Sequence, residues 1–173
     1  MLCLLAVSAA LAAFDPAALA DADHWLRDES DDQSTYQKAI ARYDAVIAAG
    51  DAPSSAYGSE AEAYVRLGDV TRDDDRKLAL YKSGQAVAEA GAARDPRCTS
   101  CWFWRGANLG RWGQTRGVLQ SLFVLGDLKS SFQKVIAIEP DNLDALLSLA
   151  LIDQNLPGFA GGSIERDEAT MRK

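Results

Sequence analysis

The sequence predicts an all-α protein built as a stack of about three to four antiparallel helical hairpins. Apolar residues recur at a spacing of three to four along most of the chain, and no stretch shows the alternation typical of a strand. Pro53, Pro96 and Pro140 each follow the apolar face of an expected helix, at separations of 43 and 44 residues. Because helical repeats bury their apolar faces against neighbouring repeats, this regularity favours an α-solenoid.

The composition fits one folded, acidic domain. The chain has 173 residues, of which 48% are apolar, and its 25 acidic and 18 basic side chains give a net charge of -7. Binding to the phosphates of nucleic acids needs a basic surface, which this balance does not supply. We therefore expect no nucleic-acid partner.

The first 20 residues are expected to be a secretory signal peptide. Residues 1–13 are almost wholly apolar, and small-residue cleavage patterns follow at Ala10-Leu11-Ala12 and at Ala18-Leu19-Ala20. The apolar run is shorter than the roughly 20 residues that a membrane-spanning helix needs. We expect export, cleavage after Ala20, and a helical domain over residues 21–173.

The first expected helix of this domain begins at a capping box formed by Ser34 and Gln37, and it ends at Gly50. Six apolar residues at helical spacing are expected to form its buried face: Tyr36, Ala39, Ile40, Tyr43, Val46 and Ile47.

Two further helices are expected before Pro96. One covers about residues 54–68 and presents Ala61, Tyr64 and Leu67 on one face. The other begins at a second capping box, formed by Thr71 and Asp74, and is closed by Pro96.

Residues 98–142 are expected to form one complete hairpin. Trp102 and Gly106 lie four apart, as the large and small residues do in the first helix of a tetratricopeptide (TPR) repeat. Phe132 and Pro140 lie eight apart, as do the aromatic residue and the closing proline of the second TPR helix. The predicted fold is therefore TPR-like.

The rest of the chain departs from a simple repeat in two places. Residues 111–124 lie between the two helices of this hairpin, and we expect this insert to form a short packed helix. After Pro140 one helix is expected over residues 143–155, and residues 164–173 begin another whose partner helix is missing. We expect either a fragment or a last hairpin completed by another subunit.

Cys98 and Cys101 form the one motif with reactive potential. A structural disulfide fits an oxidising compartment best, and two unlinked thiols remain an open alternative. A redox-active pair is disfavoured because the strand-helix-strand context of such motifs is missing. Zinc is disfavoured because a structural site needs four ligands.

No other motif supports catalysis. The one histidine, His24, has no Ser or Cys nucleophile beside it in any recognisable pattern. The sequence therefore predicts a protein that is not an enzyme and that needs no cofactor or metal.

Trp104, Asn108 and Arg111 share one face of the expected helix that begins near Cys98. Such a set fits a groove for a peptide or an organic acid, because Asn both donates and accepts hydrogen bonds and Arg clamps carboxylates. The equally open alternative is a contact between helices in which the Asn amide bonds to backbone.

Three segments carry a resemblance to a known family. ANLGRWGQTRGVLQSLF at residues 107–123, IEPDN at residues 138–142 and NLPGFAGGS at residues 155–163 make the chain similar, from about residue 39 onwards, to the TRAP-transporter T component (TatT-like) family. The resemblance implies an all-helical TPR-like fold, a periplasmic location, oligomers, and small apolar or acidic ligands. It also implies partnership with the substrate-binding protein of a TRAP transporter. The chain departs from the family in having no lipid-attachment cysteine and less helix after residue 163.

These observations predict a non-enzymatic periplasmic binding protein that is auxiliary to a TRAP-type solute transport system. It would bind the substrate-binding protein, the transported ligand, or both, and homo-oligomers are expected. The alternative is a general TPR scaffold of the cell envelope that binds other proteins. A thiol oxidoreductase that uses Cys98 and Cys101 is the enzymatic alternative.

Overall fold

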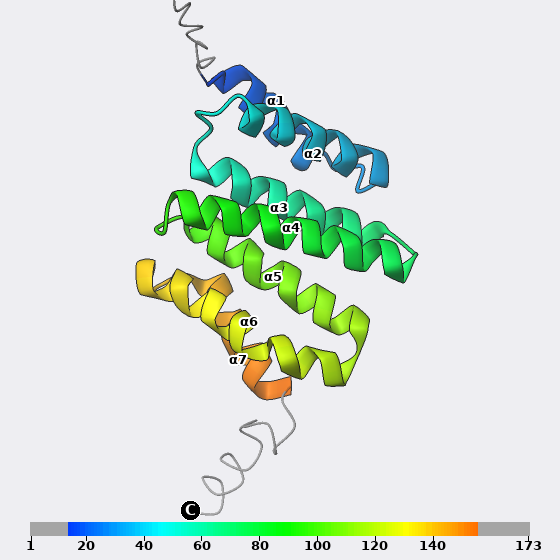
Figure 1. The fold of residues 1–173 in the computed structure, drawn as a ribbon, viewed down its shortest axis with the longest axis vertical. Coiled ribbons are helices and arrows are strands. Elements are labelled where there is room, and N and C mark those ends of the chain that lie inside the picture. Colours follow the sequence, from blue (N-terminus) through cyan, green and yellow to red (C-terminus); the bar gives the residue numbers. More distant parts are fainter. Residues whose placement is uncertain (1–13, 156–173) are drawn as a thin grey trace, which may run out of the picture.

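The structure, a computed structural model, describes residues 14–155. These residues form seven α-helices and no strand: α1 (Pro16–Leu26), α2 (Gln33–Ala48), α3 (Ser54–Val70), α4 (Asp74–Arg94), α5 (Thr99–Arg116), α6 (Val118–Ile138) and α7 (Leu143–Asn155). Successive helices lie side by side in one stack, with α1 and α2 at one end and α6 and α7 at the other (Figure 1). The all-α prediction is confirmed for the part of the chain that the structure describes.

The core lies between the helices of this stack. Its largest cluster joins α1, α2 and α3, and it buries five of the six apolar residues expected on α2; Ile47 is partly buried. A small cluster surrounds Cys98 and Cys101, and a third contains Phe132, Val135 and Ala145 of α6 and α7. Helix α3 also packs on α5, so the middle of the stack is two helices deep.

The N-cap of helix α2 lies two residues before the expected cap, Ser34. Asp32 is its N-cap, and the Asp32 carboxylate accepts hydrogen bonds from the backbone amides of Ser34 and Thr35 at 2.7 and 3.0 Å. The prediction of Ser34 as the cap was therefore wrong. A carboxylate also interacts favourably with the positive end of the helix dipole, and so it is preferred here over a hydroxyl.

The prediction of a second capping box, formed by Thr71 and Asp74, was also wrong. Asp73 caps α4 by accepting a hydrogen bond from the amide of Arg76 at 2.8 Å. The Thr71 hydroxyl instead donates to the carbonyl of Leu67 at 2.7 Å and is buried at the end of α3. Thr71 therefore closes one helix rather than opening the next.

Residues 111–124 do not form a separate helix. Helix α5 continues to Arg116, the backbone turns at Gly117 with a φ of 101°, and α6 begins at Val118. A Cβ at Gly113 would lie 3.2 Å from the Cα of Ser121, so Gly113 lets the two helices approach where the chain turns. The apolar residues of the expected insert therefore extend both helices of the hairpin.

Helix α1 includes the expected cleavage site. Asp15 caps this helix, and Ala20 lies within it. Phe14, Ala18 and Leu19 pack against the core beside the buried Ala22 and Leu26. Cleavage after Ala20 remains a prediction, and it would remove part of α1. The alternative cleavage pattern at residues 10–12 and the expected helix at residues 164–173 lie outside the described residues.

Candidate functional site

The main candidate site is a groove between α5, α6 and α7. Two adjoining cavities, of 430 and 380 Å³, share five lining residues: Gly110, Gln114, Leu128, Leu151 and Ile152. The larger cavity is also lined by Trp104, Arg111 and Phe132, and by Val65 of α3. We call this continuous feature the α5–α7 groove. Its size and mostly apolar lining are typical of small-molecule sites.

Glycines on α5 shape this groove. A Cβ at Gly106 would lie 2.9 Å from the Phe132 ring, so α6 packs closely on α5 at that level. A Cβ at Gly110 would meet only Leu128 Cδ1, at 3.6 Å, which leaves the groove open one turn further along. Gly106 and Phe132 therefore meet where the two helices of the hairpin pack together.

Among the residues that line this groove, Arg111 is the one with a cationic side chain. Its Nη2 lies 2.9 Å from Asp69 Oδ2, and its Nη1 donates to Gln114 Oε1 at 3.3 Å. Asp69 also accepts a hydrogen bond from the Tyr81 hydroxyl at 2.9 Å, which fixes the carboxylate in place. Since the Arg111 side chain is about half exposed and a guanidinium has five N–H donors, it retains donors for a bound carboxylate.

Trp104 and Asn108 have different roles. Trp104 lines the α5–α7 groove and makes an edge-on contact with Phe103. Asn108 is fully buried and does not line the groove, and its Nδ2 donates to the carbonyls of Ala61 and Trp104 at 3.0 and 2.8 Å. The structure thus brings Trp104 and Arg111 together, whereas Asn108 joins α5 to α3 as a helix contact.

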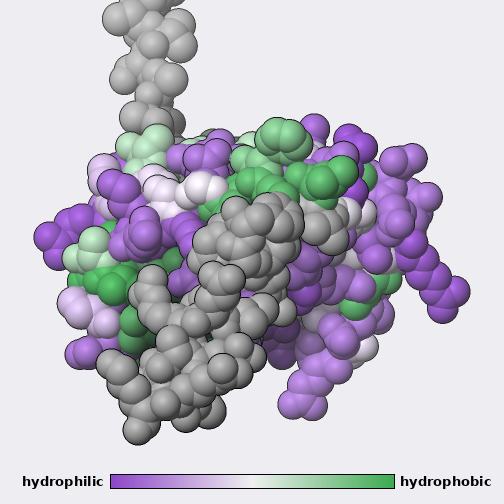
Figure 2. Space-filling model, turned by 90° about the horizontal axis from the view of Figure 1, so that it is seen from below, coloured by the Kyte–Doolittle hydropathy of each residue, from purple (hydrophilic) through white to green (hydrophobic). Residues whose placement is uncertain are grey.

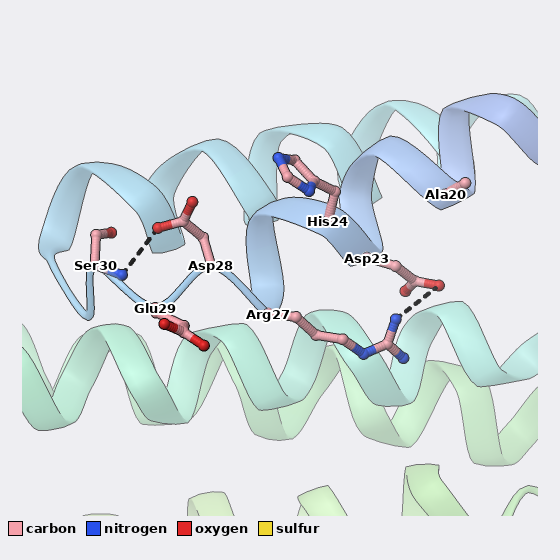
Figure 3. Close-up of a pocket in the computed structure, with 7 residues that line it drawn as sticks. All are labelled: Ala20, Asp23, His24, Arg27, Asp28, Glu29 and Ser30. Carbon is pink, nitrogen blue, oxygen red and sulfur yellow. Dashed lines mark hydrogen bonds and ion pairs between the residues drawn. The ribbon is translucent and has the colours of Figure 1, made fainter.

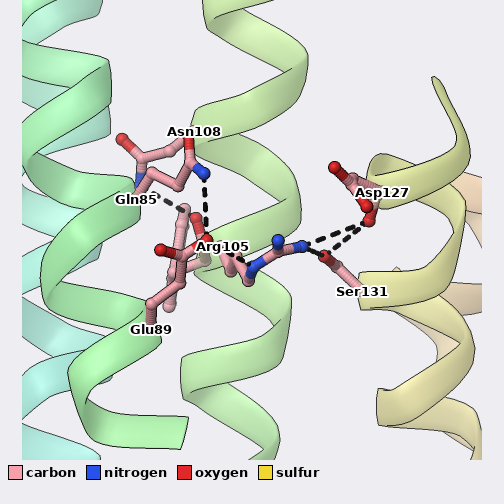
Figure 4. Close-up of polar contacts among 7 residues, drawn as sticks. Gln85, Glu89, Arg105, Asn108, Asp127 and Ser131 are labelled. Atoms are coloured by element: carbon pink, nitrogen blue, oxygen red, sulfur yellow. Dashed lines mark hydrogen bonds and ion pairs between the residues drawn. The ribbon is translucent and has the colours of Figure 1, made fainter. Parts of the chain in front are cut away.

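A polar cluster that the sequence did not reveal holds α6 against α5. Arg105 of α5 donates to Glu89 Oε1 of α4 at 2.9 Å and to the Ser131 hydroxyl of α6 at 2.7 Å (Figure 4). The same guanidinium also contacts the carbonyl of Asp127 at 3.3 Å. Because Ser131 is buried next to Phe132, this cluster fixes one wall of the α5–α7 groove.

Cys98 and Cys101 form a disulfide in the structure, with their Cα atoms 5.3 Å apart. Both residues are buried, and Cys98 is the N-cap of α5. A Cβ at Gly91 of α4 would lie 2.6 Å from the Cys101 sulfur, so the disulfide packs closely against that helix. Its position supports the prediction of a structural link at the start of the hairpin.

His24 lies in a shallow polar depression on α1 and the loop that follows it (Figure 3). The Ser30 side chain lowers the pKa of Asp28, and so does a hydrogen bond that the Ser30 amide donates to this carboxylate at 2.9 Å. Arg27 approaches Asp23 at 3.9 Å. Asp23 and Asp28 thus have local partners, and the Ser30 hydroxyl lies within hydrogen-bond distance of the Thr35 hydroxyl, at 2.6 Å.

A second cavity, between α2, α3 and α4, contains a buried acid that the sequence analysis missed. Glu60 is 1% exposed, and its Oε1 has no hydrogen-bond partner within the described residues. Burial, together with the charge and hydrogen bond of Asp44, raises the pKa of Glu60 to about 8. Glu60 follows Tyr57 by three residues and precedes Tyr64 by four, so the helical pattern already placed an acid on the inner face of α3.

Residues 14–155 contain neither a membrane-spanning helix nor a cluster of metal ligands. None of the seven helices is long and apolar enough to cross a membrane. Among the same residues, no three His, Cys, Asp or Glu side chains are grouped as ligands for a metal ion.

Comparison of the chain with models of known protein families and with curated proteins gives no match. The resemblance to the TRAP-transporter T component family therefore depends on the three sequence segments alone. One of them, residues 107–123, supplies Ala107, Gly110, Arg111 and Gln114 to the α5–α7 groove.

Proposed function

We propose that this chain is a non-enzymatic periplasmic binding protein whose α5–α7 groove receives a small organic acid with an apolar body. Trp104 and Phe132 would contact the apolar part, and Arg111 would bind the carboxylate at the rim. The observation that carries this proposal is an apolar groove with a single half-exposed guanidinium among its lining residues.

The biological role we propose is that of an auxiliary component of a TRAP-type transport system. The segment that carries the resemblance to the T component family contributes one wall of the groove. A protein that binds organic acids in the periplasm would exchange them with the substrate-binding protein of the transporter. Recognition of this partner and of the ligand would then involve neighbouring parts of the surface.

A general envelope scaffold is the second candidate, and one observation favours it. The end of the stack formed by α6 and α7 exposes large apolar side chains, and hydrophobic residues gather on this face in Figure 2. The most exposed of them are Phe123, Leu143 and Leu119 at 88, 78 and 71%. Exposed apolar surface of this kind is common at protein–protein interfaces, including those of homo-oligomers.

A pull-down separates the two candidates. The chain would be immobilised and exposed to periplasmic extract of its own source, and captured proteins would be identified by mass spectrometry. We expect the wild type to capture a TRAP-type substrate-binding protein. The Trp104→Ala variant should capture at least about tenfold less of it, because buried aromatic contacts at interfaces are worth about 2 kcal/mol or more. Trp25→Ala is the matched control, because Trp25 is also partly buried but lies in α1 at the opposite end of the stack.

Capture of the same substrate-binding protein by the wild type and by Trp104→Ala would contradict a role for the groove in this partnership. Reproducible capture of unrelated envelope proteins, with no substrate-binding protein among them, would favour the scaffold.

A further inference from the structure

The cavity between α2, α3 and α4 is separate from the α5–α7 groove and has different chemistry. It has a volume of 320 Å³, at the small end of the range typical of ligand sites. The carboxyl groups of Asp44 and Glu60 line it together with mostly apolar residues. The full lining is Asp44, Ile47, Tyr57, Glu60, Ala86, Val87 and Ala90. No lining residue is shared with the groove.

Glu60 lacks the partner that a buried acid usually has, whereas Asp44 beside it is exposed. Glu60 lines the cavity, is almost fully buried, and keeps Oε1 without a hydrogen-bond donor in the described part of the chain. No ion pair found among residues 14–155 involves Glu60 or Asp44. An unpaired buried acceptor costs free energy that a donor from a ligand would recover.

The groups that line the cavity indicate the chemistry of a ligand that would pair with Glu60. A primary ammonium carries a positive charge and three N–H donors, which match two adjacent carboxyl groups. Ile47 and Val87, with the alanines at 86 and 90, offer an apolar surface for a short alkyl chain. We propose that this cavity binds a primary ammonium on a short unbranched alkyl chain, supplied by a free amine or by a lysine side chain of a partner protein.

Binding of this cation is coupled to the release of a proton from Glu60. In the empty cavity the neutral Glu60 carboxyl donates a hydrogen bond to Asp44, and an incoming ammonium replaces that proton, which leaves to solvent. The other titratable groups at this site are the phenols of Tyr57 and Tyr64 on α3, and the lining residues from α4 do not titrate. Burial and the two acids raise the pKa of Tyr64 to about 12, so Glu60 is the group that releases the proton near neutral pH.

Calorimetric titration of the full chain with n-butylamine and with N-acetyl-lysine amide tests this inference, because both present an ammonium on a four-carbon chain. Butan-1-ol is the uncharged control. We expect saturable binding of butylamine but not of butanol, with an affinity that rises by up to about tenfold per pH unit between pH 6 and pH 8. If both amine compounds bind, the natural ligand includes lysine side chains; if butylamine binds alone, it is a free amine.

The variants make the result specific to this cavity. Glu60→Gln and Asp44→Asn are each expected to lower butylamine affinity by at least about tenfold, because each removes one of the two carboxyl groups facing the cation. Glu62→Gln is the matched control, since Glu62 lies on the same helix but pairs with Arg66 at 2.6 Å. Three results would each overturn the inference. In the first, wild type and Glu60→Gln bind butylamine equally well; in the second, the wild type binds butanol as well as butylamine. In the third, binding of butylamine is not saturated by about 10 mM.

Discussion

At pH 9 the Glu60→Gln variant is expected to be more stable than the wild type by on the order of 3 to 5 kcal/mol, whereas at pH 5 the two should be nearly equal. Glu60 is buried, and its pKa in the folded protein, about 8, lies well above that of an exposed carboxyl. Between about pH 4.5 and pH 8 the folded state therefore holds a proton that the unfolded state has lost. The contribution of Glu60 to stability is fully present below this interval and falls as the pH rises through it.

Urea unfolding of both proteins at pH 5, 7 and 9 measures this effect. Because the cavity is proposed to bind amines, the buffers should be acetate, phosphate and borate rather than amine buffers. The difference in unfolding free energy between variant and wild type should grow by up to about 1.4 kcal/mol per pH unit across the interval. Asp44→Asn should give a weaker pH dependence than the wild type, because it removes the neighbouring charge that helps to raise the pKa of Glu60. A constant difference at all three pH values would show that Glu60 does not retain its proton on folding.

Asn108→Asp is expected to destabilise the folded chain by about 3 to 5 kcal/mol at pH 7. The Asn108 amide is fully buried and donates to the carbonyls of Ala61 and Trp104. A carboxylate at this position would face two carbonyl oxygens, and Asn108 Oδ1 already has no hydrogen-bond donor within the described residues. Protonation would supply only one donor for two acceptors.

Gln114→Glu is the matched control for Asn108→Asp. It makes the same amide-to-acid change on the same helix, but Gln114 is exposed and lies beside Arg111. Gln114→Glu should change the free energy of unfolding by no more than about 0.5 kcal/mol, as most surface substitutions do. Denaturant unfolding followed by circular dichroism measures both variants. If Asn108→Asp were as harmless as Gln114→Glu, Asn108 would have to face solvent or a ligand site rather than α3.

The helical pattern of the sequence was sufficient to predict the elements between residues 34 and 110, because the buried faces are long and regular. The helix starts were less predictable. Ser34 and Thr71 had the right spacing for capping boxes, but a nearby aspartate was available in both cases and a carboxylate binds free amide groups at a helix start more strongly. The insert at residues 111–124 was misjudged because periodicity alone does not show whether two helices are extended or a third is added.

The candidate site was predicted in part. Trp104 and Arg111 both line the groove, since residues seven apart share a helix face. The same reasoning placed Asn108 with them, and its equal alternative was a contact between helices in which the amide bonds to backbone. Asn108 makes that helix contact, because α3 covers this part of α5. The Arg105 cluster depends on Ser131, which is 26 residues away, so no local pattern could have indicated it.

The most direct test of the proposed groove is an NMR titration of the isotopically labelled chain with octanoate, an apolar organic acid. We expect saturable shifts of the amides of α5, α6 and α7, centred on Trp104, Arg111 and Leu128, and no shifts around Glu60. The same shifts should need at least about tenfold more octanoate in the Trp104→Ala variant. Absence of saturable shifts, or shifts confined to helices other than α5, α6 and α7, would contradict the assignment of this groove as an organic-acid site.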